Sequence, residues 1–259
     1  MPFVTAGTAK VAYTVDGNGP PLVLVHGTAF DAAGTWAHLV DGFTDIRTVV
    51  RPDYSGAGAT VDDGGALTED GLAAQVAAVI TETADEPVDL VGFSLGAVVA
   101  ATVAATRPEL VRRLVLTAGW ARPDDPYLHT VMSTWRGLAA HPDGFGRFGT
   151  LTAFSPPFLS SIGQEQLDAI AASNRPTAGA LCHIDLNLRV DIRSRLPMIT
   201  ARTLVIGCGQ DATVPAAHAR ELHEAIAGSG YVEIDSGHVV LFEQPDRFTA
   251  AVREFIERS

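Results

Sequence analysis

The sequence predicts an α/β fold, a mostly parallel β-sheet with helices on both faces. Two observations predict it. Short apolar, β-branched runs recur along the chain, and stretches with helical spacing lie between most of them. Strands that alternate with helices pair in parallel, because each helix carries the chain back to the start of the next strand. The 259 residues, 47% of them hydrophobic, fit one large domain with an ample core.

The expected strands are short apolar runs at 11–15, 22–25, 48–51, 88–92, 114–117, 204–206 and 231–234. The expected helices are 67–83, 95–107, 216–227 and 245–258. In the first helix Leu72, Val76 and Val79 follow the spacing of one helix face. The last helix opens with Pro245, a residue that suits the first turn.

This alternation stops between Gly119 and Pro197, where the sequence shows no clear strand. The segment has seven arginines and seven acidic residues, so it is neutral, whereas the rest of the chain is strongly acidic. We expect residues 120–197 to form a helical cap over the carboxyl edge of the sheet, where ligands bind in open α/β folds. Residues 1–119 and 198–259 would form the core. Most cap aromatics would hold the cap to the core, and our candidates for substrate contact are Trp120, Trp135, Phe154 and Phe158.

Composition excludes several classes of function. The net charge of −12 argues against nucleic acid or an anionic membrane as partner. Residues 1–10 lack the features of a secretory signal, and Cys182 and Cys208 lie far apart, which suits a reduced cytoplasmic protein. No metal-ligand spacing or phosphate-binding loop is present, so we expect neither a metal nor another cofactor.

The most informative segment is Gly92-Phe93-Ser94-Leu95-Gly96, a G-x-S-x-G pentapeptide between an expected strand and an expected helix. At such a corner the serine occupies a tight, strained turn, and its hydroxyl projects above the sheet edge. The flanking glycines let strand and helix approach closely. The context therefore makes Ser94 a candidate nucleophile.

A serine hydroxyl attacks a carbonyl only when a base removes its proton, and a histidine oriented by an acid is the usual base near neutral pH. Asp211 follows the expected strand 204–206, and His238 follows the expected strand 231–234. Both therefore lie at the sheet edge that carries Ser94. His26 also follows a strand, but we interpret it as a hydrogen-bonding support for its loop. Asp124 and Asp125, beyond the preceding strand, are the alternative acids.

An enzyme of this kind also needs backbone N–H groups that stabilise the oxyanion of the tetrahedral intermediate. Leu95, directly after the serine, offers one from the start of a helix, where N–H groups are unpaired. Thr28, in the loop after the strand 22–25, is the candidate for the second.

Together these segments resemble the α/β-hydrolase fold family. The resemblance covers the whole chain except the cap, and it rests on His26-Gly27, Asp53-Tyr54-Ser55-Gly56-Ala57-Gly58, the serine pentapeptide, Gly207 to Pro215 and Gly237-His238. It implies that Ser94 is the nucleophile, His238 the base, Asp211 the acid, and Thr28 and Leu95 the oxyanion donors. Ala57 and Arg202 depart from the family pattern, in which histidine and proline are common, at positions outside the chemistry.

Three functions remain open at this point. The first is hydrolysis of an ester or thioester through an acyl-Ser94 intermediate. The second is transfer of an aromatic or hydrophobic acyl group from a carrier protein to an alcohol or amine. It follows a weaker resemblance, carried by no single motif, to the acyltransferase of thiopeptide side-ring biosynthesis, and an acyl carrier protein could dock on the cap arginines Arg136, Arg147, Arg175 and Arg189. The third is a ligand receptor or a degenerate hydrolase that keeps the fold for binding.

Overall fold

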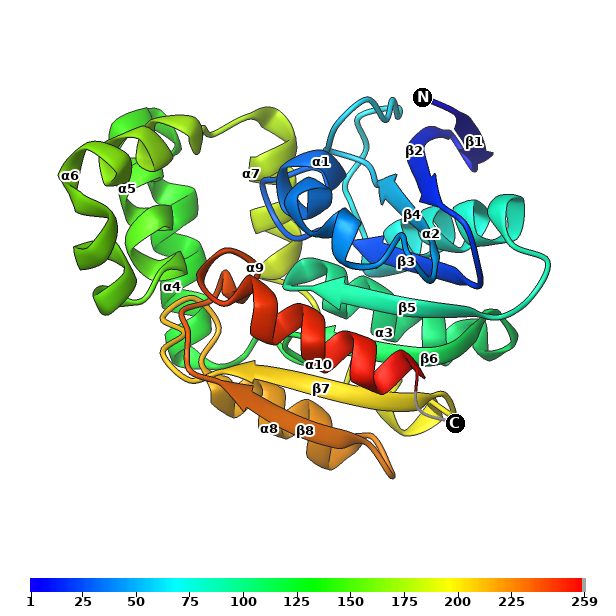
Figure 1. Cartoon of the computed structure of the whole chain (residues 1–259). Helices are drawn as coiled ribbons and strands as arrows, with labels where there is room; N and C mark the ends of the chain where they lie inside the picture. The colour runs from blue at the N-terminus through cyan, green and yellow to red at the C-terminus, as the bar shows by residue number, and fades with distance from the viewer. Residues whose placement is uncertain (258–259) are drawn as a thin grey trace.

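The computed structural model describes residues 1–257 and contains one sheet. Its strands are β1 Phe3–Ala6, β2 Ala9–Gly17, β3 Pro21–Val25, β4 Thr48–Asp53, β5 Val88–Phe93, β6 Val111–Thr117, β7 Arg202–Cys208 and β8 Gly230–Ile234. They lie in the order β1-β2-β4-β3-β5-β6-β7-β8 (Figure 1). The β1–β2 and β2–β4 pairs are antiparallel and the other pairs are parallel, which confirms the predicted fold class.

The α-helices are α1 Ala32–Trp36, α2 Glu69–Thr83, α3 Leu95–Thr106, α4 Pro126–Gly137, α5 Pro142–Ala153, α6 Pro156–Ser173, α7 Ala178–Asn187, α8 Ala216–Ala225, α9 Val240–Glu243 and α10 Pro245–Glu257. Short 3₁₀ helices span Ala37–Gly42, Pro108–Leu110, Leu138–Ala140 and Leu196–Met198. Each of the four predicted helices is present. The first begins two residues later than predicted, because Thr68 caps it by accepting a hydrogen bond from the Gly71 N–H. Residue 258, the predicted end of the last helix, lies outside the described residues.

Two hydrophobic cores lie on opposite faces of the sheet, because successive side chains of a strand point in opposite directions. In β3, Val23 and Val25 belong to the core under α2 and α3, whereas Leu22 and Leu24 belong to the core under α10. Strands buried on both faces are largely apolar. β3 is apolar throughout and β5 carries one charged residue, Asp89, which is why both were recognisable in the sequence.

Several short elements were not predicted, among them β1, α1 and α9. The edge strand β1 is half-exposed and four residues long, so its sequence lacks the buried apolar run of the inner strands. The short helix α1 spans five residues and is capped by Asp31, whose carboxylate accepts a hydrogen bond from the Gly34 N–H. None of these segments is long enough for a periodic pattern.

The segment between β6 and β7 contains helices α4 to α7 and, within residues 1–257, no strand. Figure 1 shows α4, α5 and α6 gathered beyond one end of the sheet. This arrangement supports our proposal that residues 120–197 form a cap, although the exact boundaries stay a prediction. In the part of the chain that is described, no helix has both the length and the apolar character needed to cross a bilayer.

Candidate active site

Ser94 lies at the corner between β5 and α3 in a strained backbone conformation. Its φ is +56° and its ψ is −121°, values that side-chain-bearing residues rarely adopt. Its N–H donates to the Thr117 carbonyl of β6 at 2.9 Å, which ties the corner to the neighbouring strand. The surrounding hydrogen bonds and packing therefore hold the strain and present the hydroxyl at the edge of the sheet.

The two glycines of the pentapeptide are required by close backbone contacts. A Cβ on Gly92 would lie 2.2 Å from the Gly96 carbonyl oxygen. A Cβ on Gly96 would lie 2.3 Å from the carbonyl oxygens of both Val25 and His26. Rigid backbone atoms make these contacts, so no rearrangement of side chains would relieve them. The glycines thus set the close approach of α3 to β3 and β5, as predicted.

Ser94, His238 and Asp211 form one chain of hydrogen bonds. His238 Nε2 lies 2.9 Å from Ser94 Oγ, and His238 Nδ1 lies 2.7 Å from Asp211 Oδ2. All three residues are buried. Since the carboxylate accepts from Nδ1, the neutral ring carries its proton there and presents Nε2 as an acceptor to the serine hydroxyl. The structure thus brings Ser94 and His238, which are 144 positions apart in the sequence, into contact.

Asp211 is oriented by its own loop. Its Oδ1 accepts hydrogen bonds from the Thr213 and Val214 N–H groups at 2.8 and 2.7 Å, which leaves Oδ2 for the histidine. The Gln210 N–H donates to the Ser236 carbonyl at 2.9 Å, so the loop of Asp211 is tied to the loop of His238. The alternative acids lie elsewhere: Asp125 caps α4, and Asp124 pairs with arginines at the surface.

The amides of Thr28 and Leu95 lie beside this chain. Leu95 is the first residue of α3, and Thr28 lines the same cavity as Ser94. Within residues 1–257 neither N–H has a protein acceptor. Two unpaired donors next to a serine are the arrangement that an oxyanion hole needs.

His26 supports the loop rather than acting on substrate. Its Nδ1 donates to the Gly27 carbonyl at 2.9 Å, and its ring stacks on Tyr54 with centroids 3.8 Å apart. Its complete burial lowers the pKa to about 4, mainly because the charged ring would lose its hydration. A neutral ring with both nitrogens engaged matches the structural interpretation made from the sequence.

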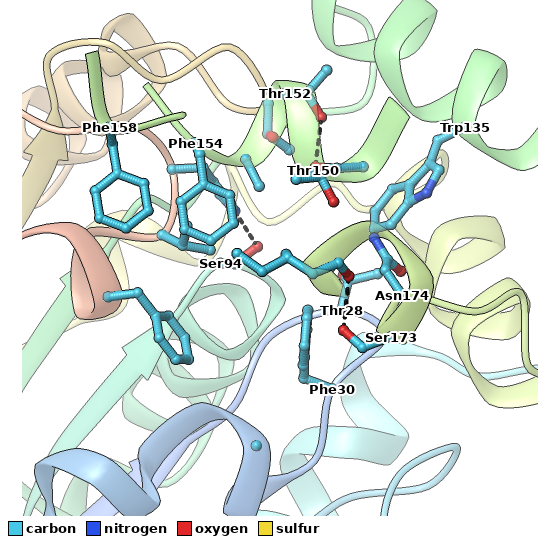
Figure 2. Close-up of a pocket in the computed structure, with 18 of the residues that line it drawn as sticks. Thr28, Phe30, Ser94, Trp135, Thr150, Thr152, Phe154, Phe158, Ser173 and Asn174 are labelled. Carbon is cyan, nitrogen blue, oxygen red and sulfur yellow. Dashed lines mark hydrogen bonds between the residues drawn. The ribbon is translucent and has the colours of Figure 1, made fainter. Parts of the chain in front are cut away.

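A cavity of about 440 Å³ opens over Ser94, between the core and the cap. Figure 2 shows Ser94 between Phe154 and Phe158 on one side and Trp135, Thr150 and Asn174 on the other. The Phe154 and Phe158 rings stack, with centroids 5.1 Å apart. Within residues 1–257, no Asp, Glu, Lys or Arg lines the cavity. His238 is the one lining side chain of the described residues that can carry charge near neutral pH. The walls suit an uncharged ligand.

Trp120 is the exception among the predicted substrate contacts. Trp135, Phe154 and Phe158 line the cavity, but Trp120 does not. It follows β6 almost directly and is completely buried in the core with α3 and α4. That prediction is corrected, because the Trp120 side chain is enclosed by core residues and has no surface left to face the cavity.

Sequence reasoning missed the residues that connect the cap to the site. Asn187 of α7 donates from Nδ2 to Thr28 Oγ1 at 2.9 Å, and His183 of α7 accepts from the Ala29 N–H at 3.3 Å. Ser155 donates twice to the Glu243 carboxylate, through its N–H at 2.6 Å and its hydroxyl at 2.7 Å. These partners are 88 to 159 positions apart in the chain, so no local pattern could reveal them.

Metal-ligating side chains do not gather in the described residues: residues 1–257 contain no cluster of three or more His, Cys, Asp or Glu side chains that could hold an ion. Both cysteines are free, Cys182 exposed and Cys208 buried.

Comparisons with known proteins agree with this architecture. The family model described as the alpha/beta hydrolase family matches residues 22–251. The structure is similar to MGS-M2, an alpha/beta hydrolase from a deep-sea metagenome library of the Medee basin, with a TM-score of 0.90 and 21% identity. That match covers 100% of this chain and 98% of the other, and at this identity it shows the fold alone.

Two sequence relatives carry named activities. The chain is 39% identical to pyrrolizixenacetamide deacetylase of Xenorhabdus hominickii over 260 residues, which cover 99% of this chain and 98% of that protein. It is 30% identical to a pimeloyl-(acyl-carrier protein) methyl ester esterase of Neisseria meningitidis over 201 residues, 74% of each protein. Both names describe the hydrolysis of an acyl bond.

Proposed function

The chain belongs to the alpha/beta hydrolase family and is an enzyme, and we propose that it hydrolyses an uncharged ester or amide through a covalent acyl-Ser94 intermediate. One observation carries the proposal: the hydrogen-bond chain from Asp211 through His238 to Ser94, beside two unpaired amides. A serine, a base and an oriented acid, with donors for the oxyanion, make up the machinery of acyl transfer to serine.

In the first half-reaction Ser94 Oγ attacks the carbonyl carbon while His238 Nε2 takes the hydroxyl proton. Negative charge moves to the carbonyl oxygen, where the Thr28 and Leu95 amides stabilise it. Asp211 stabilises the imidazolium. The C–O or C–N bond then breaks, and His238 gives its proton to the departing oxygen or nitrogen. Water attacks the acyl-Ser94 ester with His238 again as base, and the serine regains its proton.

The substrate class follows from the cavity and from a relative. Walls without Asp, Glu, Lys or Arg would leave a charged substrate unpaired, so we propose an uncharged, largely apolar compound. The relative that is 39% identical is named as a deacetylase, which favours removal of a small acyl group from an amine. An uncharged, largely apolar acetamide is accordingly the first substrate to try.

Acyl transfer is the second candidate, because the cavity extends to both sides of Ser94 between apolar walls. One side could hold the acyl group and the other an alcohol or amine in place of water. An acyl carrier protein as donor stays a proposal. Three of the four cap arginines proposed to dock it, Arg136, Arg147 and Arg175, pair with cap carboxylates, so their charges would be partly offset.

The deciding experiment treats the wild type and Ser94→Ala with a fluorophosphonate and measures intact mass. We expect one adduct on the wild type and none on the variant, because only a serine activated by His238 reacts. Aryl acetates and acetamides then separate hydrolysis from transfer when products are identified with and without added alcohols or amines. A wild type that forms no adduct would refute an activated serine and favour the receptor.

A further inference from the structure

The loop that supplies the Thr28 amide is held by one face of the cap helix α7. His183 and Asn187 are four residues apart, so both side chains project from the same side of the helix. The Ala29 N–H donates to His183 Nδ1, and His183 Nε2 donates to the Ser55 carbonyl at 2.8 Å. Ala29 has a φ of +65°, a strained value for alanine that these contacts help to maintain.

The second contact involves the side chain of Thr28 rather than its backbone. Asn187 Nδ2 lies 2.9 Å from Thr28 Oγ1 and 3.6 Å from Met132 Sδ. Asn187 is 1% exposed and Thr28 is 8% exposed. Burying polar groups costs free energy unless they are hydrogen-bonded. The hydrogen bond between Asn187 and Thr28 offsets that cost and holds the two side chains together.

The orientation of the Asn187 amide follows from its neighbours. Its nitrogen faces two acceptors, the threonine oxygen and the methionine sulfur, whereas its Oδ1 is buried and has no partner within residues 1–257. The reversed amide would direct its oxygen at the sulfur, which can only accept. Asn187 is therefore the donor, and Thr28 Oγ1 is the acceptor.

A hydroxyl has one proton and two lone pairs. Asn187 occupies one lone pair of Thr28 Oγ1, and in the part of the chain that is described the proton has no acceptor. Thr28 lines the cavity together with Ser94 (Figure 2). The unused proton is thus available to a ligand atom in the cavity that Ser94 also lines.

We propose that the Thr28 hydroxyl is a third hydrogen-bond donor to the oxyanion, and that Asn187 is the positioning residue that orients it. The inference rests on the proposed acyl-Ser94 chemistry. No proton is transferred: the hydroxyl donates a hydrogen bond to the carbonyl oxygen as that oxygen gains charge, beside the amides of Thr28 and Leu95. The bond strengthens in the transition state, so it acts on kcat more than on KM.

The test compares Thr28→Val, which keeps the shape but removes the hydroxyl, with Thr28→Ser, which keeps the hydroxyl. We expect Thr28→Val to lower kcat for an aryl acetate by about 10²-fold, the typical effect of one lost oxyanion donor, with KM changed little. Thr28→Ser should recover most of that loss. Affinity for a trifluoromethyl ketone, whose tetrahedral adduct carries an oxyanion, should fall with kcat. Equal losses in both variants, or none in Thr28→Val, would overturn the role.

Asn187→Leu tests the positioning residue, because leucine fills a similar volume without a donor. It should lower kcat and trifluoromethyl ketone affinity, leave KM nearly unchanged, and add nothing to Thr28→Val in the double variant. Independent, multiplicative losses would show that Asn187 acts otherwise. Thermal melts of all variants report folding. Labelling of wild-type Ser94 by the fluorophosphonate keeps the two proposals distinct: without it the serine chemistry fails, whereas normal labelling with an active Thr28→Val refutes only the third donor.

Discussion

At the scale of single residues, the candidate site contains one carboxylate that is held by its own loop. Asp211 accepts from two backbone N–H groups through Oδ1 and meets His238 through Oδ2. An amide at this position would retain the shape but would direct a donor or a weaker acceptor at the histidine. The tautomer of the ring, and with it the basicity of Nε2 toward Ser94, depends on this contact.

Asp211→Asn should therefore lower kcat by on the order of 10⁴-fold. The circular dichroism spectrum should remain that of the wild type, because the loop keeps its backbone hydrogen bonds. Steady-state kinetics on an aryl acetate measure the loss. Asp124→Asn is the matched control, since Asp124 pairs with surface arginines and should keep full activity. The reverse pattern would make Asp124 the functional acid.

The residues that could be predicted are those whose neighbours in the chain dictate their geometry. Ser94 is recognisable because Gly92 and Gly96 permit the close contacts of its corner. Asn187 is not, since its role depends on Thr28, 159 positions away. A buried asparagine in a helix carries no local mark of the loop that it will meet.

At the scale of elements, the cap segment between β6 and β7 supplies many of the residues that line the cavity. Trp135 belongs to α4, Phe154 follows α5, and Phe158 belongs to α6. α6 is largely exposed, and its apolar residues Ile162 and Ile170 face the cavity. Substrate preference should thus reside in the cap, and serine reactivity in the core.

Trp135→Ala and Phe154→Ala test this division. Each should change the ratio of kcat/KM between small and bulky acetates or acyl groups by about tenfold, the effect of roughly 1.4 kcal/mol of lost contact. The rate of Ser94 labelling by a small fluorophosphonate should change far less. Leu151→Ala is the control, because Leu151 is 58% exposed on α5 and does not line the cavity. Unchanged preference in both variants would remove these aromatics from substrate binding.

At the scale of the whole molecule, two buried histidines, one in the core and one in the cap, make the stability of the fold depend on pH. His26 of the core and His183 of the cap have rings 6.3 Å apart, and burial lowers the pKa of each to about 4. In the unfolded chain both would titrate near 6.5. Between these values the unfolded state binds more protons, so the free energy of unfolding falls as pH falls from about 6.5 toward 4.

Urea unfolding at pH 7.5, 6 and 5 measures this effect. We expect little change above pH 7, then a loss of up to about 1.4 kcal/mol per pH unit for each histidine. His183→Gln should be less stable at pH 7.5, because the Ser55 and Ala29 contacts weaken, but its stability should depend less on pH. A pH dependence identical to that of the wild type would mean that the pKa of His183 is the same in the folded and unfolded states.

The chain alone predicted the α/β architecture and the candidate serine, acid and base, because short-range rules govern them: buried strands are largely apolar, and only glycine tolerates the contacts around Ser94. The tertiary structure decided which aromatics face the cavity, placed Trp120 in the core, and brought α7 to the Thr28 loop. These outcomes depend on how the cap packs on the sheet. That packing joins residues distant in sequence, and no local pattern encodes their contacts.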